Sequence, residues 1–295
     1  MTERTLELFS ALNTTRYGRS NLIAAFLGGS VQNRKRELGA LRREGWLKSP
    51  TQQKETANYR YSPRIYELAD KAKTALRKSG VSVIDWEAEQ EFKRELFWHR
   101  LMIADIVWLF KISSAKHGMR FRSRTDILGS KPLSLPCQIE FPLSGGRTVP
   151  YNHALRPDEL LAVEDTYLVI EADRGSERIK SSSADVSSYQ RKLLQYRHVY
   201  VNRLYQKLWG IQTLFTLHVT LSHEHSQNIM QFMDEDLQAK SRGQLFAAFP
   251  VLGARDTYPT PIDLLEHPFK RVGYDPLIIG KEIIDGRYRK TSTSV

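Results

Sequence analysis

Three acidic residues lie where the sequence predicts two β-strands joined by a tight turn. Apolar runs on either side of Glu164-Asp165 are typical of a β-hairpin. With these two residues as the loop, Asp158 faces Glu171 across the hairpin, because directly opposed residues share a face. Asp173 points the same way, since side chains alternate along a strand. The pattern therefore predicts that Asp158, Glu171 and Asp173 converge at one end of the hairpin.

Converging carboxylates repel one another unless a cation relieves the repulsion. Mg²⁺ and Mn²⁺ prefer hard oxygen ligands, and their bound waters can be activated for attack on a phosphodiester. We therefore expect Asp158 and Glu171 to bind Mg²⁺ or Mn²⁺. The residues alone leave a second interpretation open, in which Asp158 caps a turn and Glu171 forms a surface ion pair with Arg174 or Arg178.

The elements around the hairpin predict an α/β domain. A long amphipathic helix is expected over residues 86–116, and a second over 185–208, where Lys192 and Tyr196 lie side by side at a spacing of four. The other expected elements are strands over 119–125, 138–143, 211–221 and 244–249, a helix over 226–239 and a loosely ordered end from residue 287.

Residues 1–80 carry most of the positive charge. The formal net charge of the chain is +11; this segment has 16 Lys and Arg against 7 Asp and Glu, and the remainder has 28 against 26. Helices are predicted over residues 3–12, with Thr2 as N-cap, over 21–27, capped by Ser20, and from Ser30 to about Glu44. In the third helix Val31, Leu38 and Leu41 are expected to face inward.

The start of this third helix has the composition of a DNA-recognition helix. Asn, Gln and Arg match the edges of adenine and guanine in the major groove. A two-stranded wing over residues 46–62 and a closing helix over 63–76 would complete a winged helix-turn-helix. The alternatives are a helical bundle for protein contacts and a merely basic surface. The residues expected to bind DNA are Gln32, Asn33, Arg34, Lys35, Arg36, Arg42, Arg43, Lys54, Tyr59 and Arg60.

Length and composition exclude several protein classes. The 295 residues, 41% hydrophobic and 26% charged, indicate a folded chain of about two domains. We expect neither a membrane span nor a secretory signal, so a cytoplasmic location is predicted. The single cysteine, Cys137, excludes an internal disulfide and a cysteine-based zinc site.

The motifs together resemble the replication-relaxation family of plasmids and other mobile elements, and the related MOB-C type relaxases. The segments that carry the resemblance are the N-terminal winged helix, residues 97–106, Arg156-Pro157-Asp158, residues 170–177 and residues 191–196. The order of helix, strands, acidic hairpin, helix and strand is also similar to the restriction-endonuclease-like core, whose motif is PD…(D/E)xK.

The resemblance implies an α+β chain: a winged helix-turn-helix over residues 1–84, then a restriction-endonuclease-like mixed sheet flanked by helices over 85–295. It implies Asp158 and Glu171 as ligands of Mg²⁺ or Mn²⁺, with His99 as a further ligand. The motif lysine is replaced by Asp173, so Lys192 would supply the missing cation unless the site no longer cuts.

The expected function is sequence-specific, metal-dependent nicking of double-stranded DNA at a transfer or replication origin, in plasmid mobilization, conjugation or DNA replication. The alternative is a non-catalytic DNA-binding accessory factor or transcription regulator with a degenerate nuclease fold. Further partners would be other relaxosome or coupling proteins and a second copy of the chain. Tyr189 and Tyr196 remain alternatives for a covalent mechanism, and His223 and His225 for a histidine metal cluster.

Overall fold

The chain forms two compact units in a computed structural model that describes residues 2–56, 58–84, 86 and 94–292. The first unit comprises Met1–Phe121 and Val251–Leu265, and the second comprises Arg122–Pro250 and Glu266–Val295. This division differs from the predicted boundary at residue 84. The long helix α5 (Arg94–Lys116) groups with the N-terminal module, and residues 87–93 of the predicted helix lie outside the described residues.

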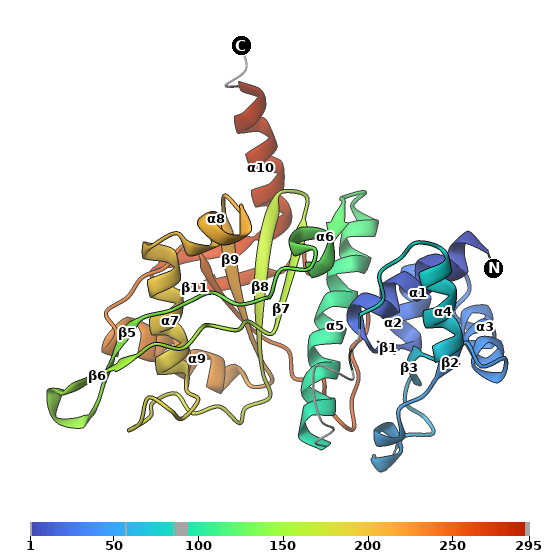
Figure 1. The fold of residues 1–295 in the computed structure, drawn as a ribbon, viewed down its shortest axis with the longest axis horizontal. Helices are drawn as coiled ribbons and strands as arrows, with labels where there is room; N and C mark the ends of the chain where they lie inside the picture. The colour runs from blue at the N-terminus through green and yellow to red at the C-terminus, as the bar shows by residue number, and fades with distance from the viewer. Residues whose placement is uncertain (1, 57, 85, 87–93, 293–295) are drawn as a thin grey trace. The chain divides into compact units, whose positions relative to one another are not determined.

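The first unit combines helices with a small antiparallel sheet of strand order β1-β3-β2. This is the arrangement expected of a winged helix-turn-helix (Figure 1). In chain order its elements before α5 are α1 (Glu3–Thr15), β1 (Gly18–Arg19), α2 (Ser20–Leu27), α3 (Val31–Arg43), β2 (Leu47–Lys48), a 3₁₀ turn (Thr51–Glu55), β3 (Ile65–Leu68) and α4 (Asp70–Lys78).

Several local predictions for this unit are corrected. The second strand of the wing is β3 and not residues 58–62, because Ile65 and Leu68 pair with β1 and β2, respectively, and are buried. The closing helix consequently begins at Asp70. Helix α2 has Arg19, not Ser20, at its N-cap. On α3 Leu38 is buried as expected, whereas Val31 is 51% exposed.

Helix α5 is held in the first unit by buried hydrogen bonds and an ion pair as well as by apolar packing. The Arg19 Nε lies 3.1 Å from both carboxylate oxygens of Asp105, which is on α5. The Trp108 indole donates a hydrogen bond of 2.8 Å to the carbonyl of Tyr17. Gly253 closes against α5 and donates its N–H to Asp105 over 3.1 Å. These contacts join segments that are far apart in the sequence.

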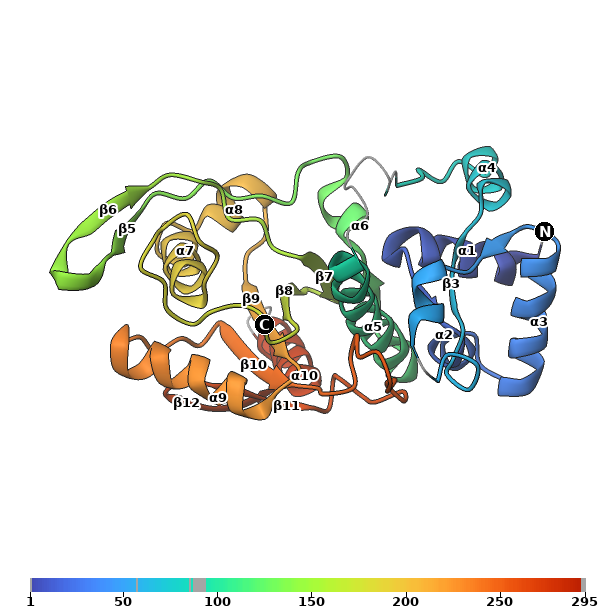
Figure 2. The same cartoon turned by 90° about the horizontal axis from the view of Figure 1, so that it is seen from below.

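The second unit contains a mixed seven-stranded sheet of order β12-β11-β10-β9-β8-β7-β4. Its strands are β4 (Phe121–Arg122), β7 (Glu159–Val163), β8 (Thr166–Asp173), β9 (Leu214–Thr220), β10 (Gln244–Ala248), β11 (Pro268–Arg271) and β12 (Tyr274–Ile278). A separate two-stranded sheet, β5 (Ile139–Pro142) with β6 (Thr148–Tyr151), extends beside α7 (Tyr189–Val201), as Figure 2 shows. The mixed α and β content agrees with the predicted fold class.

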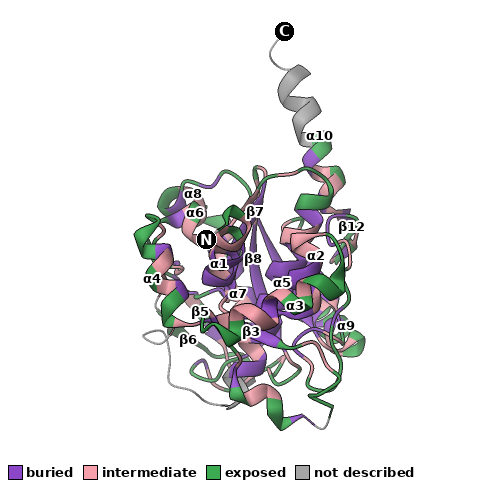
Figure 3. Ribbon diagram, turned by 90° about the vertical axis from the view of Figure 1, so that its right-hand side faces the viewer, coloured by how far each residue is buried: buried purple, intermediate pink, exposed green. Residues whose placement is uncertain are grey.

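The central hairpin has the predicted register. Strand β7 pairs antiparallel with β8, with Glu159 opposite Ile170 and Val163 opposite Thr166. Glu164 has a φ of 52°, the left-handed conformation that a tight two-residue loop requires. Strand β8 then runs parallel to β9, and β9 parallel to β10. Figure 3 shows the hairpin strands as buried, in agreement with the continuous apolar runs.

The helices of this unit differ in detail from the predictions. The segment 185–208 forms two helices, α7 and α8 (Leu204–Trp209), separated where Arg203 takes a φ of 48°. Within the predicted strand 119–125 only Phe121–Arg122 is a strand, and α6 (Arg124–Leu128) follows. Helix α9 (His223–Gln231) continues as a π-helical turn, Phe232–Asp236.

The C-terminal end differs most from expectation. Helix α10 (Ile279–Ser292) covers much of the segment expected to be loosely ordered, and residues 293–295 lie outside the described part of the chain. Strands β11 and β12 were not predicted. Among the described helices, none is sufficiently long and apolar to span a membrane.

Candidate functional site

Glu171, an acidic residue of the hairpin, lies on the face of the sheet that packs against helix α7. Glu171 on β8 is paired with His218 on the parallel strand β9, and Asp173 with Thr220. All four side chains are buried. Because residues alternate along a strand, Glu171 and Asp173 share this face. Charged groups at such a position need specific partners, and the structure supplies them.

Asp158 is placed by the backbone of the opposite strand. Its N–H donates to the carbonyl of Ile170 over 3.1 Å, and its Oδ2 accepts a hydrogen bond of 2.8 Å from the N–H of Ala172. These two bonds join Asp158 to both chain neighbours of Glu171. The predicted register of the hairpin is confirmed as far as Glu159 and Ile170, and Asp158 follows it at the position opposite Glu171. The N–H whose hydrogen bond Asp158 accepts belongs to the opposite strand and not to a turn, which differs from the alternative in which Asp158 caps a turn.

Glu171 is buried and makes two polar contacts to helix α7. The residue is only 2% exposed to solvent. Tyr196 donates its hydroxyl hydrogen to Oε1, and the Nζ of Lys192 lies 2.9 Å from Oε2. The alternative pairing of Glu171 with Arg174 or Arg178 is wrong, because the partner cation comes from α7. Helix α7 thus packs over the hairpin as the role of Lys192 requires.

Lys192 contacts a second carboxylate that the sequence reasoning missed. Its Nζ lies 2.7 Å from Oε2 of Glu177, so one ammonium group bridges two acids. The other oxygen of Glu177 accepts a hydrogen bond of 2.6 Å from the hydroxyl of Ser187. The Nζ also lies 5.1 Å from the centre of the Tyr189 ring, within reach of a cation–π interaction.

Burial and charge shift the pKa values of this cluster in ways that fit its contacts. Burial raises the pKa of Glu171 to about 7; Lys192 opposes this shift and the charge of Asp158 adds to it. Burial lowers the pKa of Lys192, but the carboxylates of Glu171 and Glu177 outweigh it and hold the pKa well above its ordinary value. Lys192 is therefore a permanent cation, whereas Glu171 changes charge near neutral pH.

Asp173 occupies the position of the motif lysine but makes other contacts. Its Oδ1 accepts hydrogen bonds from the N–H groups of Gly175, Ser176 and Glu177, at 2.8, 3.1 and 3.4 Å. Its Oδ2 lies 2.7 Å from Nε2 of His225, on the first turn of α9. Asp173 thus anchors the turn after β8 and binds a histidine. Asp followed two residues later by Gly is the sequence signal for such a turn.

Helix α7 also buries both tyrosines that were alternatives for a covalent mechanism. Tyr189 and Tyr196 are fully buried. Burial raises the pKa of each phenol well above its ordinary value, which disfavours the phenolate that a nucleophile needs. Of the two histidines considered for a metal cluster, His225 is bound to Asp173, and His223 is exposed on α9.

One buried histidine of this site carries no signal in the sequence. His218 lies under α7 and stacks on Phe246, with ring centres 4.8 Å apart. Burial, together with the charge of Lys192, lowers its pKa to about 3, so the ring is neutral. Its Nε2 pairs with Gln244 Oε1 over 3.1 Å. His218 therefore adds no charge to the cluster of Glu171, Lys192 and Glu177.

The donor set fits a hard divalent ion. Asp158 and Glu171 offer carboxylate oxygens from neighbouring strands, and Mg²⁺ characteristically binds one or two protein carboxylates together with waters and substrate phosphates. Oε2 of Glu171 is held by Lys192, so an ion and this lysine would compete for the same oxygen. His99 belongs to α5 in the first unit, and its role as a ligand stays a prediction.

The predicted DNA-binding residues fall on exposed parts of the first unit. On α3 the side chains of Gln32, Asn33, Lys35 and Arg36 are exposed, and so are Arg42 and Arg43 at its end. Arg34 differs, because its Nε donates to the carbonyl of Gly28 over 2.9 Å and its guanidinium pairs with Glu37. Arg34 therefore stabilises the turn between α2 and α3 instead of extending from the helix.

The loop between β2 and β3 adds exposed aromatic and basic groups. Lys54, Tyr59 and Arg60 are exposed, and the Arg60 Nε donates to the Tyr59 hydroxyl over 3.2 Å. Tyr61, which the sequence reasoning did not select, is 88% exposed. Exposed aromatic and basic side chains together are suited to contacts with nucleic acid bases and phosphates.

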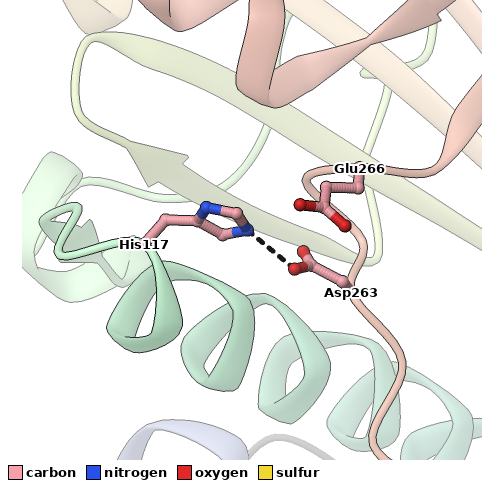
Figure 4. Close-up of side chains that lie close together, drawn as sticks. All are labelled: His117, Asp263 and Glu266. Atoms are coloured by element: carbon pink, nitrogen blue, oxygen red, sulfur yellow. Dashed lines mark hydrogen bonds and ion pairs between the residues drawn. The ribbon is translucent and has the colours of Figure 1, made fainter.

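The sequence reasoning also missed an exposed histidine, His117, that contacts Asp263 at the end of α5. His117 Nε2 lies 2.7 Å from Oδ2 of Asp263 (Figure 4). Lys116 Nζ lies 2.8 Å from the same oxygen. Lys116, His117 and Asp263 all belong to the first unit. These contacts tie the end of α5 to the later segment of the chain that forms part of the same unit.

Comparison with known proteins gives one match. The model of the replication-relaxation family matches residues 9–214, which include the first unit through α5, the acidic hairpin and helix α7. No curated protein and no solved structure matches the chain.

Proposed function

The chain belongs to the replication-relaxation family, which associates it with DNA replication and mobility, and on this premise we propose that it is a metal-dependent DNA-nicking enzyme. It would recognise an origin through its N-terminal module and cut one strand through the site around Glu171. The substrate is double-stranded DNA at a transfer or replication origin. This is the activity expected of a MOB-C type relaxase with a restriction-endonuclease-like core.

The convergence of Asp158, Glu171 and Lys192 is the observation that carries this proposal. The three residues come from the position just before β7, from β8 and from helix α7, and the Nζ of Lys192 lies 2.9 Å from Oε2 of Glu171. Two acids and one lysine are the groups of the PD…(D/E)xK motif. The order α5, β4, β7, β8, α7, β9 along the chain also follows the order of that nuclease core.

Each residue has a separate task in the proposed reaction. Asp158 and Glu171 would hold a divalent ion, which supplies an activated water and neutralises the phosphate. Tyr196 fixes the orientation of the Glu171 carboxylate through its hydroxyl. Lys192 stays charged and can stabilise the negative charge that develops on the phosphate. Water is the nucleophile that fits best, because Tyr189 and Tyr196 are both buried.

DNA recognition is assigned to α3 and the wing. The exposed Asn33 and Gln32 would contact base edges, and Lys35, Arg36, Arg42 and Arg43 would contact phosphates or guanines. The net charge of the N-terminal 80 residues supports this assignment, because phosphate attraction supplies most non-specific DNA affinity. Homodimers on paired half-sites, and other relaxosome proteins as partners, extend the same proposal.

A non-catalytic DNA-binding factor is the second candidate. The observation that favours it is Asp173, which stands at the position of the motif lysine and is engaged by the turn and by His225. In such a protein the cluster of Glu171 and Lys192 would be a buried ion pair with a structural role only.

Supercoiled plasmid carrying the origin of the host element separates the two candidates. The wild-type protein with Mg²⁺ or Mn²⁺ is expected to convert it to relaxed circles, and Asp158→Ala and Glu171→Ala are expected to abolish the conversion. Asp185→Ala, at an exposed acid of the same unit, is the matched control and should nick normally. Sequence-specific binding by an inert wild-type protein, with every metal tried, would instead establish the accessory factor.

A further inference from the structure

Lys192 contacts two carboxylates that differ in their surroundings. Glu171 is buried between the strand and α7, and it also accepts the hydroxyl of Tyr196. Glu177 is partly exposed, and its second oxygen is held by Ser187. The distances from Nζ are 2.9 Å to Glu171 and 2.7 Å to Glu177. The ammonium group of Lys192 can therefore shift toward either acid and still form a hydrogen bond.

The position of Glu177 is set by Asp173. The N–H groups of Gly175, Ser176 and Glu177 all point to Oδ1 of Asp173, which folds the chain after β8 into a tight turn. The turn brings Oε2 of Glu177 to 2.7 Å from the Nζ of Lys192. The acid that replaces the motif lysine thus builds the support for the lysine supplied by α7.

We propose that Glu177 is a positioning residue that receives Lys192 when a divalent ion takes the oxygen of Glu171, so that the lysine is exchanged between two carboxylates instead of being expelled. This inference rests on the proposed metal site at Asp158 and Glu171. Without Glu177, Lys192 would have Glu171 as its remaining acidic partner at hydrogen-bonding distance, and ion binding would have to break that pair without compensation.

Mn²⁺ binding to the full chain without DNA tests the exchange independently of nicking. Isothermal titration calorimetry or the electron paramagnetic resonance signal of free Mn²⁺ would give the dissociation constant. Glu177→Gln is expected to weaken Mn²⁺ binding about tenfold or more, the usual effect of removing a group that supports metal ligands. Glu140→Gln removes an exposed acid from the same unit and should leave the dissociation constant unchanged.

A double-mutant cycle with Lys192→Met separates exchange from simple charge attraction. If Glu177 acts by receiving the lysine, Glu177→Gln should have no effect on Mn²⁺ affinity in the Lys192→Met background. If Glu177 merely attracts cations, the tenfold penalty should persist there, and the inference is overturned. Melting curves of each variant establish that the proteins compared are folded.

The experiment also distinguishes failure of the exchange from failure of the proposed function. Wild-type protein that binds no Mn²⁺, or that binds it equally well as Asp158→Ala, removes the metal site and the exchange with it. Wild-type binding that depends on Asp158 and is unaffected by Glu177→Gln refutes the exchange alone and leaves the nicking proposal standing.

Discussion

Replacing Arg19 by methionine should strongly destabilise the first unit. The Arg19 and Asp105 side chains are 3% and 0% exposed, and Nε lies 3.1 Å from each carboxylate oxygen. Without Arg19, Asp105 keeps the N–H of Gly253 as a hydrogen-bond donor at 3.1 Å. Removing one partner of a buried ion pair leaves an uncompensated charge and lowers the free energy of unfolding by about 3–5 kcal/mol.

Replacing Asp105 together with Arg19 should restore part of the lost stability. Burial raises the pKa of Asp105, and Arg19 opposes that rise, so the unpaired acid will tend to take up a proton. Arg19→Met with Asp105→Leu removes both charges and should be less destabilised than Arg19→Met alone. Arg36→Met, at an exposed arginine of the same unit, should change the free energy of unfolding by less than about 0.5 kcal/mol.

Urea unfolding followed by tryptophan fluorescence measures these differences, because Trp98 and Trp108 are buried on α5. Hydrogen exchange over residues 97–116 assigns the loss to the first unit. A loss below about 1 kcal/mol for Arg19→Met, or a double variant as unstable as the single one, would refute the reasoning that this pair fastens α5 to the N-terminal module.

Two further predictions concern DNA and pH. Asn33→Ala should lower specific DNA affinity by about 1–3 kcal/mol in a binding titration, whereas Arg34→Ala should mainly lower the melting temperature, because Arg34 holds the carbonyl of Gly28; the reverse pattern would contradict the placement of the recognition surface. At a metal concentration far below saturation, nicking should fall about tenfold per pH unit below a pKa of about 7, because Glu171 must lose its proton to bind a metal ion and burial raises its pKa to about 7. A rate that is flat from pH 5 to 8 at that metal concentration would contradict the role of Glu171 as a ligand.

The same raised pKa sets the sign of a stability effect. Between the ordinary carboxyl pKa and about pH 7, the folded protein keeps a proton on Glu171 that the unfolded chain has already released. The contribution of Glu171 to the free energy of unfolding is therefore fully present below the ordinary carboxyl pKa and is lost as the pH rises through about 7. Metal binding favours the deprotonated carboxylate and thereby offsets this loss.

Local rules were sufficient for part of this protein. The register of the hairpin follows from the alternation of side chains and from the two-residue loop, so the opposition of Asp158 and Glu171 was readable from the sequence. The first helix, with its Thr2 cap, and the end of α2 at Gly28 depend on neighbouring residues only. The excess of positive charge in the first 80 residues is likewise a property of composition.

Contacts between distant segments decided the rest. Residues 65–68 became a strand because β1 and β2 supply partners on both sides, which a helical spacing of apolar residues cannot reveal. Helix α5 joined the first unit through Asp105, whose partner lies 86 residues away. Arg34, expected on the DNA surface, instead binds the carbonyl of Gly28 across the turn between α2 and α3.

The site itself shows the same division. The sequence by itself determined which acids oppose one another, because a hairpin is a local structure with a fixed period. The family resemblance named Lys192 as the candidate cation, but only the tertiary structure decided that it meets Glu171, since that depends on how α7 packs on the sheet. It also decided that Asp173 anchors a turn and that Glu177, six residues beyond Glu171, shares the same lysine. Which side chains become partners in this way depends on how the elements pack in three dimensions, and the distance between residues along the sequence does not predict it.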